Sequence, residues 1–286
     1  MNISVVITTY NRPDFLQEAL IGVSQQTLPP HEIIIIDDCS SISYGEVYPL
    51  AEKLQARYLK QKSGVGANAA RNIGIKESSG DIVAFLDDDD IWLPNYLKVI
   101  HEEYLNGADA VVSGFKQLGK EEVVVINRDL DVTKTSLLRG NTYCGMSGFS
   151  AKRDLLLQNS FDELLNNGQD WDMYVRLFQR GIKFRNIPEP IFLYRFQNED
   201  GIGAKVRKMK PCEIEKRLGS AYKHRTFLGD YWFKKRICDQ ILFSLKHKNE
   251  KSRWIIQALK RAGFKATFVF FFNALRRKVL NKPMII

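Results

Sequence analysis

Apolar and polar positions in the first 115 residues alternate between two periodicities. Short apolar runs, such as the four consecutive isoleucines of the second one, predict buried β-strands at residues 3–8, 32–37, 56–60, 81–87 and 110–115. The stretches between them place apolar residues at helical spacing, which predicts helices at residues 13–25, 67–78 and 94–106. This alternation is typical of an α/β fold with a doubly wound, mainly parallel central sheet.

The pattern changes after about residue 118. Further strands are predicted where the chain leaves the parallel order, and one more helix interrupts them; the strands are 122–126, 145–150, 183–187 and 191–196, and the helix is 170–180. Beyond Gly203 the pattern predicts helices only. We therefore expect a first domain at residues 1–202, in two halves at 1–115 and 116–202, and a helical C-terminal extension at 203–286.

Polar residues follow three of the predicted parallel strands at the point where each strand ends. Thr8 to Arg12 follow the first strand, Asp37 and Asp38 end the second, and four consecutive aspartates, Asp87 to Asp90, end the fourth. In doubly wound sheets ligands bind at the carboxyl ends of the strands. The convergence of three polar groups on one edge of the sheet predicts a binding site there.

The four aspartates (Asp87, Asp88, Asp89 and Asp90, called the acidic cluster below) repel one another unless a cation or water screens them. Carboxylate oxygens suit Mg²⁺ or Mn²⁺, and such an ion bridges a diphosphate and stabilises its negative charge as it leaves. The alternative is a solvated turn that caps the next helix, because aspartate is favoured at helix N-caps. We assign that capping role to Asp90 alone.

Charge is distributed unevenly along the chain. Residues 203–286 contain 22 Lys and Arg but 5 Asp and Glu, whereas the first 202 residues are net acidic. The acidic part is expected to bind something cationic and the tail something anionic. Four scattered cysteines, no secretory signal pattern and no apolar run long enough to span a bilayer together predict a cytoplasmic protein.

Four ordered segments of the chain resemble the family 2 glycosyltransferases, which have the GT-A fold, invert the sugar's anomeric configuration and depend on a metal. The segments read VVITTYNRPDFLQEAL, EIIIIDDCS, GANAARNIGIKESSGDIVAFLDDDDIWLPNYL and GQDWDMYVRLFQRG. The resemblance covers residues 1 to about 200. It implies a nucleotide-sugar donor and a bound Mn²⁺ or Mg²⁺ ion.

The resemblance also implies roles for individual residues. Those in the nucleotide-sugar site would be Thr8, Tyr10, Arg12, Asp38, Arg71, Asp87 and Asp88, with Asp89 as the main metal ligand. Asp38 would accept a hydrogen bond from the uracil N–H, which favours a uridine donor; the alternative is a cap after the second strand. Arg71 would contact the nucleotide or the acidic cluster, and an ordinary salt bridge across its helix is the alternative.

An inverting transfer needs one carboxylate base to take the proton of the acceptor hydroxyl. The motif GQDWDMYVRL implies Asp170 as that base and Asp172 as its rival. Gln169 stands where the family usually has Glu, so it is assigned to acceptor binding. Trp171 would stack on a sugar or pack beneath the site. The segment 146–148, which includes Gly148, would form the acceptor floor or belong to the core.

These inferences predict a transferase that moves a hexose, glucose or galactose, from a UDP-sugar with formation of a β-linkage. The acceptor would be a polyprenyl-diphosphate-linked saccharide in O-antigen- or capsule-type polysaccharide synthesis. The basic tail, with the apolar run 268–272 before Arg276, Arg277 and Lys278, is expected to lie on an anionic membrane surface or to pack on the catalytic domain. We expect no nucleic-acid binding. The alternatives are a sugar-phosphate nucleotidyltransferase and a non-catalytic assembly partner of the same fold.

Overall fold

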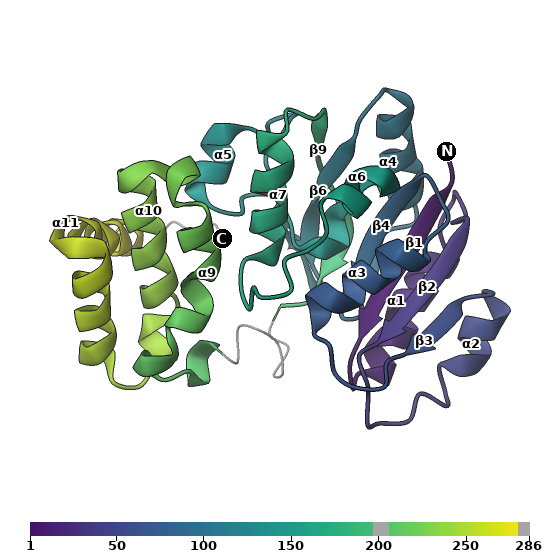
Figure 1. The fold of residues 1–286 in the computed structure, drawn as a ribbon, viewed down its shortest axis with the longest axis horizontal. Helices are drawn as coiled ribbons and strands as arrows, with labels where there is room; N and C mark the ends of the chain where they lie inside the picture. Colours follow the sequence, from purple (N-terminus) through teal and green to yellow (C-terminus); the bar gives the residue numbers. More distant parts are fainter. Residues whose placement is uncertain (197–205, 280–286) are drawn as a thin grey trace. The chain divides into compact units, whose positions relative to one another are not determined.

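A mixed nine-stranded sheet organises the first 196 residues of the computed structural model, which describes residues 1–196 and 206–279 (Figure 1). The strand order is β3-β2-β1-β4-β8-β6-β9-β5, and β7 pairs with β6. The strands are β1 (Ile3–Thr9), β2 (Glu32–Asp37), β3 (Arg57–Lys60), β4 (Ile82–Asp87), β5 (Ile91–Trp92), β6 (Ala110–Gln117), β7 (Lys120–Val125), β8 (Phe149–Lys152) and β9 (Phe184–Tyr194). Strands β1 to β4 are mutually parallel, as predicted.

The helices between these strands cover the sheet, and close packing places α3 over β1 (Figure 1). A Cβ atom on Gly74 of α3 would lie 2.2 Å from the side chain of Val6, so only glycine permits this approach. The helices of this region are α1 (Pro13–Ser24), α2 (Tyr48–Lys53), α3 (Ala67–Glu77), α4 (Tyr96–Leu105), α6 (Arg153–Gln158) and α7 (Gln169–Gln179), with the 3₁₀ helix η1 (Met146–Gly148). The predicted alternation of strands and helices in the first half is thus confirmed.

Three predicted strands differ from the structure in the second half. The predicted strand 145–150 is the 3₁₀ turn η1 followed by β8, which is antiparallel to β4 and β6. The two predicted strands 183–187 and 191–196 are one strand, β9. Its register with β6 shifts beside Gly114, and this irregularity accommodates Pro188 and Pro190, which cannot donate to a regular ladder.

The described residues form two units. Unit 1 contains residues 1–134, 141–163 and 173–196; unit 2 contains 135–140, 164–172 and the described residues after 205. Helix α7 therefore belongs to unit 2 through its first four residues and to unit 1 through the rest. The predicted boundary between residues 202 and 203 lies outside the described residues.

Unit 2 is helical. Its helices are α5 (Lys134–Arg139, from residue 135 on), η2 (Pro211–Glu213), α9 (Glu215–Lys223), α10 (Arg225–Leu242), η3 (Leu245–His247) and α11 (Lys251–Val279). Gly229 and Gly263, both with positive φ, kink α10 and α11. Buried Phe233, Ile241 and Trp254 form part of the core between α10 and α11. No helix in the described ranges is long and apolar enough to cross a membrane.

Candidate active site

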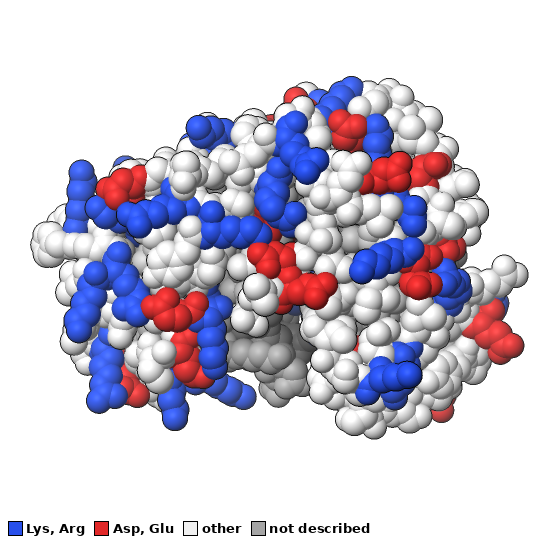
Figure 2. Space-filling model, in the orientation of Figure 1, with Lys and Arg blue, Asp and Glu red and all other residues white. Residues whose placement is uncertain are grey.

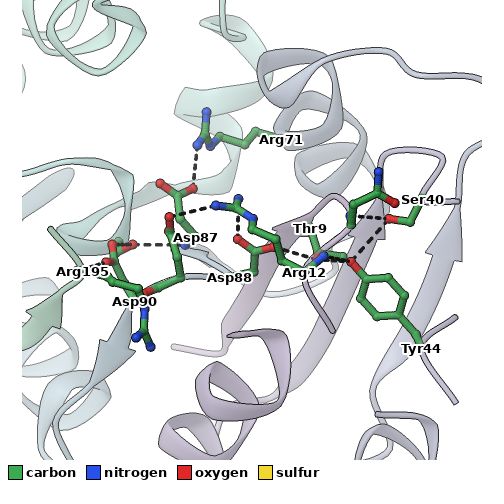
Figure 3. Close-up of polar contacts among 12 residues, drawn as sticks. Thr9, Arg12, Ser40, Tyr44, Arg71, Asp87, Asp88, Asp90 and Arg195 are labelled. Atoms are coloured by element: carbon green, nitrogen blue, oxygen red, sulfur yellow. Dashed lines mark hydrogen bonds and ion pairs between the residues drawn. The ribbon is translucent and has the colours of Figure 1, made fainter. Parts of the chain in front are cut away.

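The acidic cluster lies where β4 ends, and Figure 3 shows Asp87, Asp88 and Asp90 there. Its four side chains divide into two pairs by burial. Asp88 and Asp90 are buried, whereas Asp87 and Asp89 reach solvent. The cluster forms a turn in which the backbone N–H of Asp90 donates to the backbone oxygen of Asp87 at 3.1 Å, and one pair of carboxylates points into the protein. The other pair remains accessible to a ligand.

Arg12 joins the acidic cluster to the loop after β1. Its guanidinium lies 2.6 Å from Oδ1 of Asp88 and 2.9 Å from Oδ2 of Asp89. Burial raises the pKa of Asp88 to about 7, although Arg12 and a hydrogen bond from Thr9 act against this rise. Burial lowers the pKa of Arg12, but the attraction of the surrounding carboxylates outweighs it and the pKa is raised. The cluster therefore holds the guanidinium of Arg12 in its charged form.

Arg71 reaches the acidic cluster from α3. Its Nη2 atom donates to Oδ1 of Asp87 at 2.6 Å, and the buried guanidinium also lies 5.7 Å from the ring centroid of Phe161. Of the two contacts implied for Arg71, the one with the acidic cluster is present. The ion pair crosses from helix to strand end, so it orients Asp87 within the site.

The assignment of Asp90 as a helix cap is wrong. Helix α4 begins at Tyr96, after the short strand β5, and Asp90 points into the protein instead. Ser147 Oγ donates to Oδ2 of Asp90 at 2.5 Å, and the backbone N–H of Arg195 donates to Oδ1 at 2.9 Å. The strand β5 lies between Asp90 and α4, so Asp90 cannot cap that helix. Through its two hydrogen bonds Asp90 instead ties the end of β4 to η1 and to the end of β9.

Tyr44 and Arg195 are site residues that the sequence analysis missed. The Tyr44 hydroxyl accepts from the backbone N–H of Arg12 at 2.9 Å and bonds Oγ1 of Thr9 at 2.8 Å, so it shapes the loop after β1 (Figure 3). Arg195 donates from Nε to the backbone oxygen of Asp89 at 2.9 Å and pairs with Glu18. Neither residue lies in a recognisable motif, and only the fold brings them to the site.

The residues predicted to line the nucleotide pocket occupy three environments. Thr8 is buried in β1 and Tyr10 is exposed on the loop that follows it. Asp38 accepts backbone N–H groups of Val65 at 2.5 Å and of Gly66 at 3.0 Å. These bonds hold the loop that leads into α3, whose N-cap residue is Gly66, so Asp38 does not cap a helix after the second strand. Its carboxylate keeps further acceptor capacity.

The segment that contains the predicted base belongs to unit 2. Asp170 Oδ1 accepts the backbone N–H of Trp171 at 2.7 Å, near the start of α7. The buried Trp171 donates from Nε1 to the backbone oxygen of Leu137 at 2.8 Å, and the Arg236 guanidinium lies 3.5 Å from its ring centroid. Trp171 is therefore packed beneath the surface, and we no longer assign it to sugar stacking.

Asp172, the rival base, is fully buried and makes charged contacts in unit 2. His224 Nε2 lies 2.6 Å from its Oδ1 atom, and Lys223 Nζ lies 2.9 Å from the same atom. These contacts give Asp172 a structural role. Gly148 is also buried, and a Cβ atom there would lie 2.6 Å from the Phe192 ring. Close packing thus accounts for Gly148, and we no longer assign it to the acceptor floor.

The carboxylates of the acidic cluster fit a divalent cation that shares its coordination with a diphosphate. Across residues 1–196 and 206–279, no three His, Cys, Asp or Glu side chains are arranged to hold an ion by themselves. Mg²⁺ commonly uses only one or two carboxylates together with substrate phosphates. Asp89, at 21% side-chain exposure and next to the cation-binding Asp88, offers hard oxygen atoms of this kind.

Comparison with known proteins agrees with this geometry. The model described as "Glycosyl transferase family 2" matches residues 4–165. YwdF, an uncharacterized glycosyltransferase of Bacillus subtilis, is 31% identical over 212 residues, which cover 69% of this chain and 75% of YwdF. An uncharacterized glycosyltransferase of Methanocaldococcus jannaschii is 25% identical over 84% of this chain and 83% of its own.

Solved structures show the same fold. TarS 1-349 of S. aureus superposes with a TM-score of 0.65 at 21% identity, covering 93% of this chain and 82% of that one. The mannosyltransferase PcManGT of Pyrobaculum calidifontis has a TM-score of 0.60 at 16% identity, covering 96% of this chain and 80% of the other. The expected GT-A fold is confirmed, and the nucleotidyltransferase alternative is set aside. With its family motifs in place, the chain belongs to glycosyl transferase family 2 and is a glycosyltransferase.

Proposed function

We propose that the protein transfers a hexose from a UDP-sugar to an acceptor hydroxyl with inversion, so that an α-linked donor yields a β-linkage. The observation that carries this proposal is the acidic cluster at the end of β4, which pairs with Arg12 and Arg71 and whose outer carboxylates reach solvent. Related solved structures support a nucleotide-sugar donor: TarS 1-349 is in complex with UDP and with UDP-GlcNAc, and PcManGT is in complex with GDP-Man and Mn²⁺. Glucose or galactose is our choice of sugar.

In this proposal the residues of unit 1 bind and orient the donor. Asp89 would hold Mn²⁺ or Mg²⁺, which when bound stabilises the negative charge that develops on the leaving diphosphate. Arg12 and Arg71 already lie on the acidic cluster, with Thr9 and Tyr44 fixing the loop that carries Arg12. Asp38 would accept the uracil N–H. Tyr10, exposed on the same loop as Arg12, would lie beside the base.

Asp170 would remove the proton from the acceptor hydroxyl. A single displacement needs only this base on the acceptor side, and the buried role of Asp172 leaves Asp170 as the better choice. Gln169, immediately before it, would bind the acceptor through its amide. We propose a lipid-linked saccharide of a surface polysaccharide as acceptor. In support, 100 residues are 36% identical to TuaG of Bacillus subtilis, a protein named as a candidate teichuronic acid biosynthesis glycosyltransferase.

The donor is tested by calorimetric titration with UDP and GDP in the presence of Mn²⁺. The wild-type protein is expected to bind UDP more tightly than GDP. Asp38→Asn should weaken UDP binding by about 10-fold, because a hydrogen bond to a charged group is worth roughly 1.5–3 kcal/mol. Asp14→Asn, an exposed site on α1, serves as the control. Tighter binding of GDP by the wild-type protein would contradict the uridine assignment.

The tail would hold the enzyme on an anionic membrane at the cytoplasmic face. After Gly263, helix α11 exposes Phe264, Phe268 and Phe272, whose rings stack with centroids 6.0 and 6.3 Å apart. Lys and Arg side chains gather over α9 to α11 (Figure 2). An exposed aromatic ridge among cations suits the headgroup region of a bilayer. The side chains of Arg277 and Lys278, part of the predicted basic run, lie outside the described residues.

Replacing the three ridge phenylalanines with serine should reduce binding to vesicles that contain phosphatidylglycerol by at least about 10-fold. Burying one phenylalanine contributes roughly 1.5–3 kcal/mol, so the loss of three exceeds this threshold. Vesicle co-sedimentation measures the effect. Tyr231→Ser, which removes an exposed aromatic of α10 outside the ridge, is the matched control. Unchanged sedimentation of the triple variant would exclude the ridge as the membrane contact.

A further inference from the structure

Two cationic side chains of unit 2 are buried without a carboxylate partner in the part of the chain that the structure describes. Arg217 of α9 is 9% exposed, and Lys248, which follows η3, is 2% exposed. The Nε and Nη1 atoms of Arg217 have no hydrogen-bond partner. Lys248 Nζ donates to the backbone oxygen of Ile241 at 2.9 Å. Buried cations in proteins are normally paired with an anion, so these two are exceptional.

The two cations gather at the C-terminal end of α10. Lys248 contacts Ile241 in its last turn, and the Arg217 guanidinium lies 5.7 Å from the ring centroid of Phe243, the residue after the helix. Burial lowers the pKa of Arg217 to about 10. Burial also lowers the pKa of Lys248 to about 8, and the positive charge of Arg217 adds to this effect. The like charges are therefore close enough to repel each other.

The surrounding groups attract cations but do not neutralise them. Lys248 Nζ lies 3.8 Å from the ring centroid of Trp254, and the end of a helix carries partial negative charge. Neither supplies a full counter-charge for two ions. Trp254 adds to the imbalance, because its buried Nε1–H also lacks an acceptor. The region is thus rich in hydrogen-bond donors and short of acceptors, which is the chemistry of an anion site.

We propose that Arg217 and Lys248 bind a phosphate-bearing anion, a phosphate or diphosphate group. A guanidinium presents its N–H groups as a fork that matches phosphate oxygens, and an ammonium adds a compact positive charge. Such a ligand would supply the acceptors that Arg217 Nε, Arg217 Nη1 and Trp254 Nε1 lack. It would also remove the repulsion between the two cations.

The site adjoins the segment that carries the proposed base. The Asn167 amide donates to the backbone oxygen of Arg217 at 3.4 Å. One turn further along α9, Ser220 packs against Gly168, where an added Cβ atom would lie 2.7 Å from Ser220 Oγ. Asp170 follows two residues later. Resting on the proposed function, we assign the anion to the phosphate group that links the acceptor to its lipid.

The test is titration of the full chain with inorganic pyrophosphate and with farnesyl diphosphate, in EDTA, followed by calorimetry and thermal unfolding. Arg217→Gln and Lys248→Met are each expected to lower pyrophosphate affinity at least 10-fold. The control Lys246→Met removes an exposed cation only two residues from Lys248 and should bind pyrophosphate as the wild-type protein does. All variants should bind UDP with Mn²⁺ normally, which separates failure of this site from failure of the proposed donor chemistry.

Without any anion, Lys248→Met should unfold at the same or a higher temperature than the wild-type protein, because it removes an unneutralised buried charge. Lys248→Met is therefore expected to fold, so its pyrophosphate affinity tests the proposed anion site even if Arg217→Gln does not fold. Tighter binding of farnesyl diphosphate than of pyrophosphate would support a lipid-linked source, and equal binding would assign the site to free phosphate compounds instead. The proposal is overturned if pyrophosphate does not bind the wild-type protein, or binds Lys248→Met equally well.

Discussion

Replacing Asp170 with asparagine is expected to lower the rate of sugar transfer by roughly 100- to 10,000-fold, the usual contribution of a general base. Asparagine keeps the size of the side chain and can still accept the N–H of Trp171, so the start of α7 should persist. UDP binding in the presence of Mn²⁺ should be unchanged, because the proposed donor groups lie elsewhere in the sequence. The rate of sugar transfer to a saccharide acceptor and the affinity for UDP should be measured on the same preparation of each protein.

Asp172→Asn is the matched comparison, two residues along the same helix. Asp172 accepts from His224 and pairs with Lys223 inside unit 2, so neutralising it removes the charge that faces the buried His224 and the partly exposed Lys223. We expect the free energy of unfolding to fall by about 3 kcal/mol, with transfer by the folded fraction largely retained. If folded Asp172→Asn is inactive while Asp170→Asn transfers sugar normally, the base has been assigned to the wrong carboxylate.

Removing the carboxylate of Asp89 by an Asp89→Ala substitution should abolish the dependence of UDP binding on Mn²⁺. Among the four aspartates, Asp88 and Asp90 are buried in contacts that hold the sheet edge together, and Asp87 is paired with Arg71. Asp89 pairs with Arg12 but reaches solvent, and it stands at the position that the family resemblance assigns to the metal ligand. A lost ionic ligand should weaken UDP binding by about 100-fold, since a metal contributes several kcal/mol to charge stabilisation.

The measurement is calorimetric titration with UDP, with Mn²⁺ and then with EDTA. The wild-type protein should lose affinity when EDTA removes the metal, whereas Asp89→Ala should bind UDP weakly under both conditions. Asp14→Ala removes an exposed carboxylate from α1, outside the acidic cluster, and should behave as the wild-type protein. Metal-dependent binding that survives in Asp89→Ala would move the ligand role to Asp87.

The sequence predicts most of unit 1 because its strands are simple apolar runs. All of residues 33–37 in β2 are buried, and the predicted bounds of that strand agree with the structure. The short helix α2 was missed because six residues give too little periodicity to detect. Residues 183–187 and 191–196 were predicted as two strands, and only pairing with β6 shows that a bulge lets one strand continue. Local pattern carries no information about such partners.

For the site, the motif positions were predictable but the partners of each side chain were not. Arg12 and the acidic cluster were placed together by the rule that strand ends converge. The inward turn of Asp90 depends on Ser147 and Arg195, which lie 57 and 105 residues away in the chain. The contact of Arg236 with the Trp171 ring and that of His224 with Asp172 could not be predicted from the sequence for the same reason. Contacts between distant segments of this kind require the three-dimensional structure.

The division of helix α7 between the two units bears on how such enzymes can be recombined. Gln169 to Asp172 belong to unit 2, and the helices after residue 205 supply the partners of Trp171 and Asp172. A chimera that exchanges only the C-terminal helices would leave the base segment with foreign partners. A crossover near residue 164, together with exchange of residues 135–140, keeps that segment with its own supports. The proposed base would then be inherited with the tail, although it lies within the resemblance to the catalytic family.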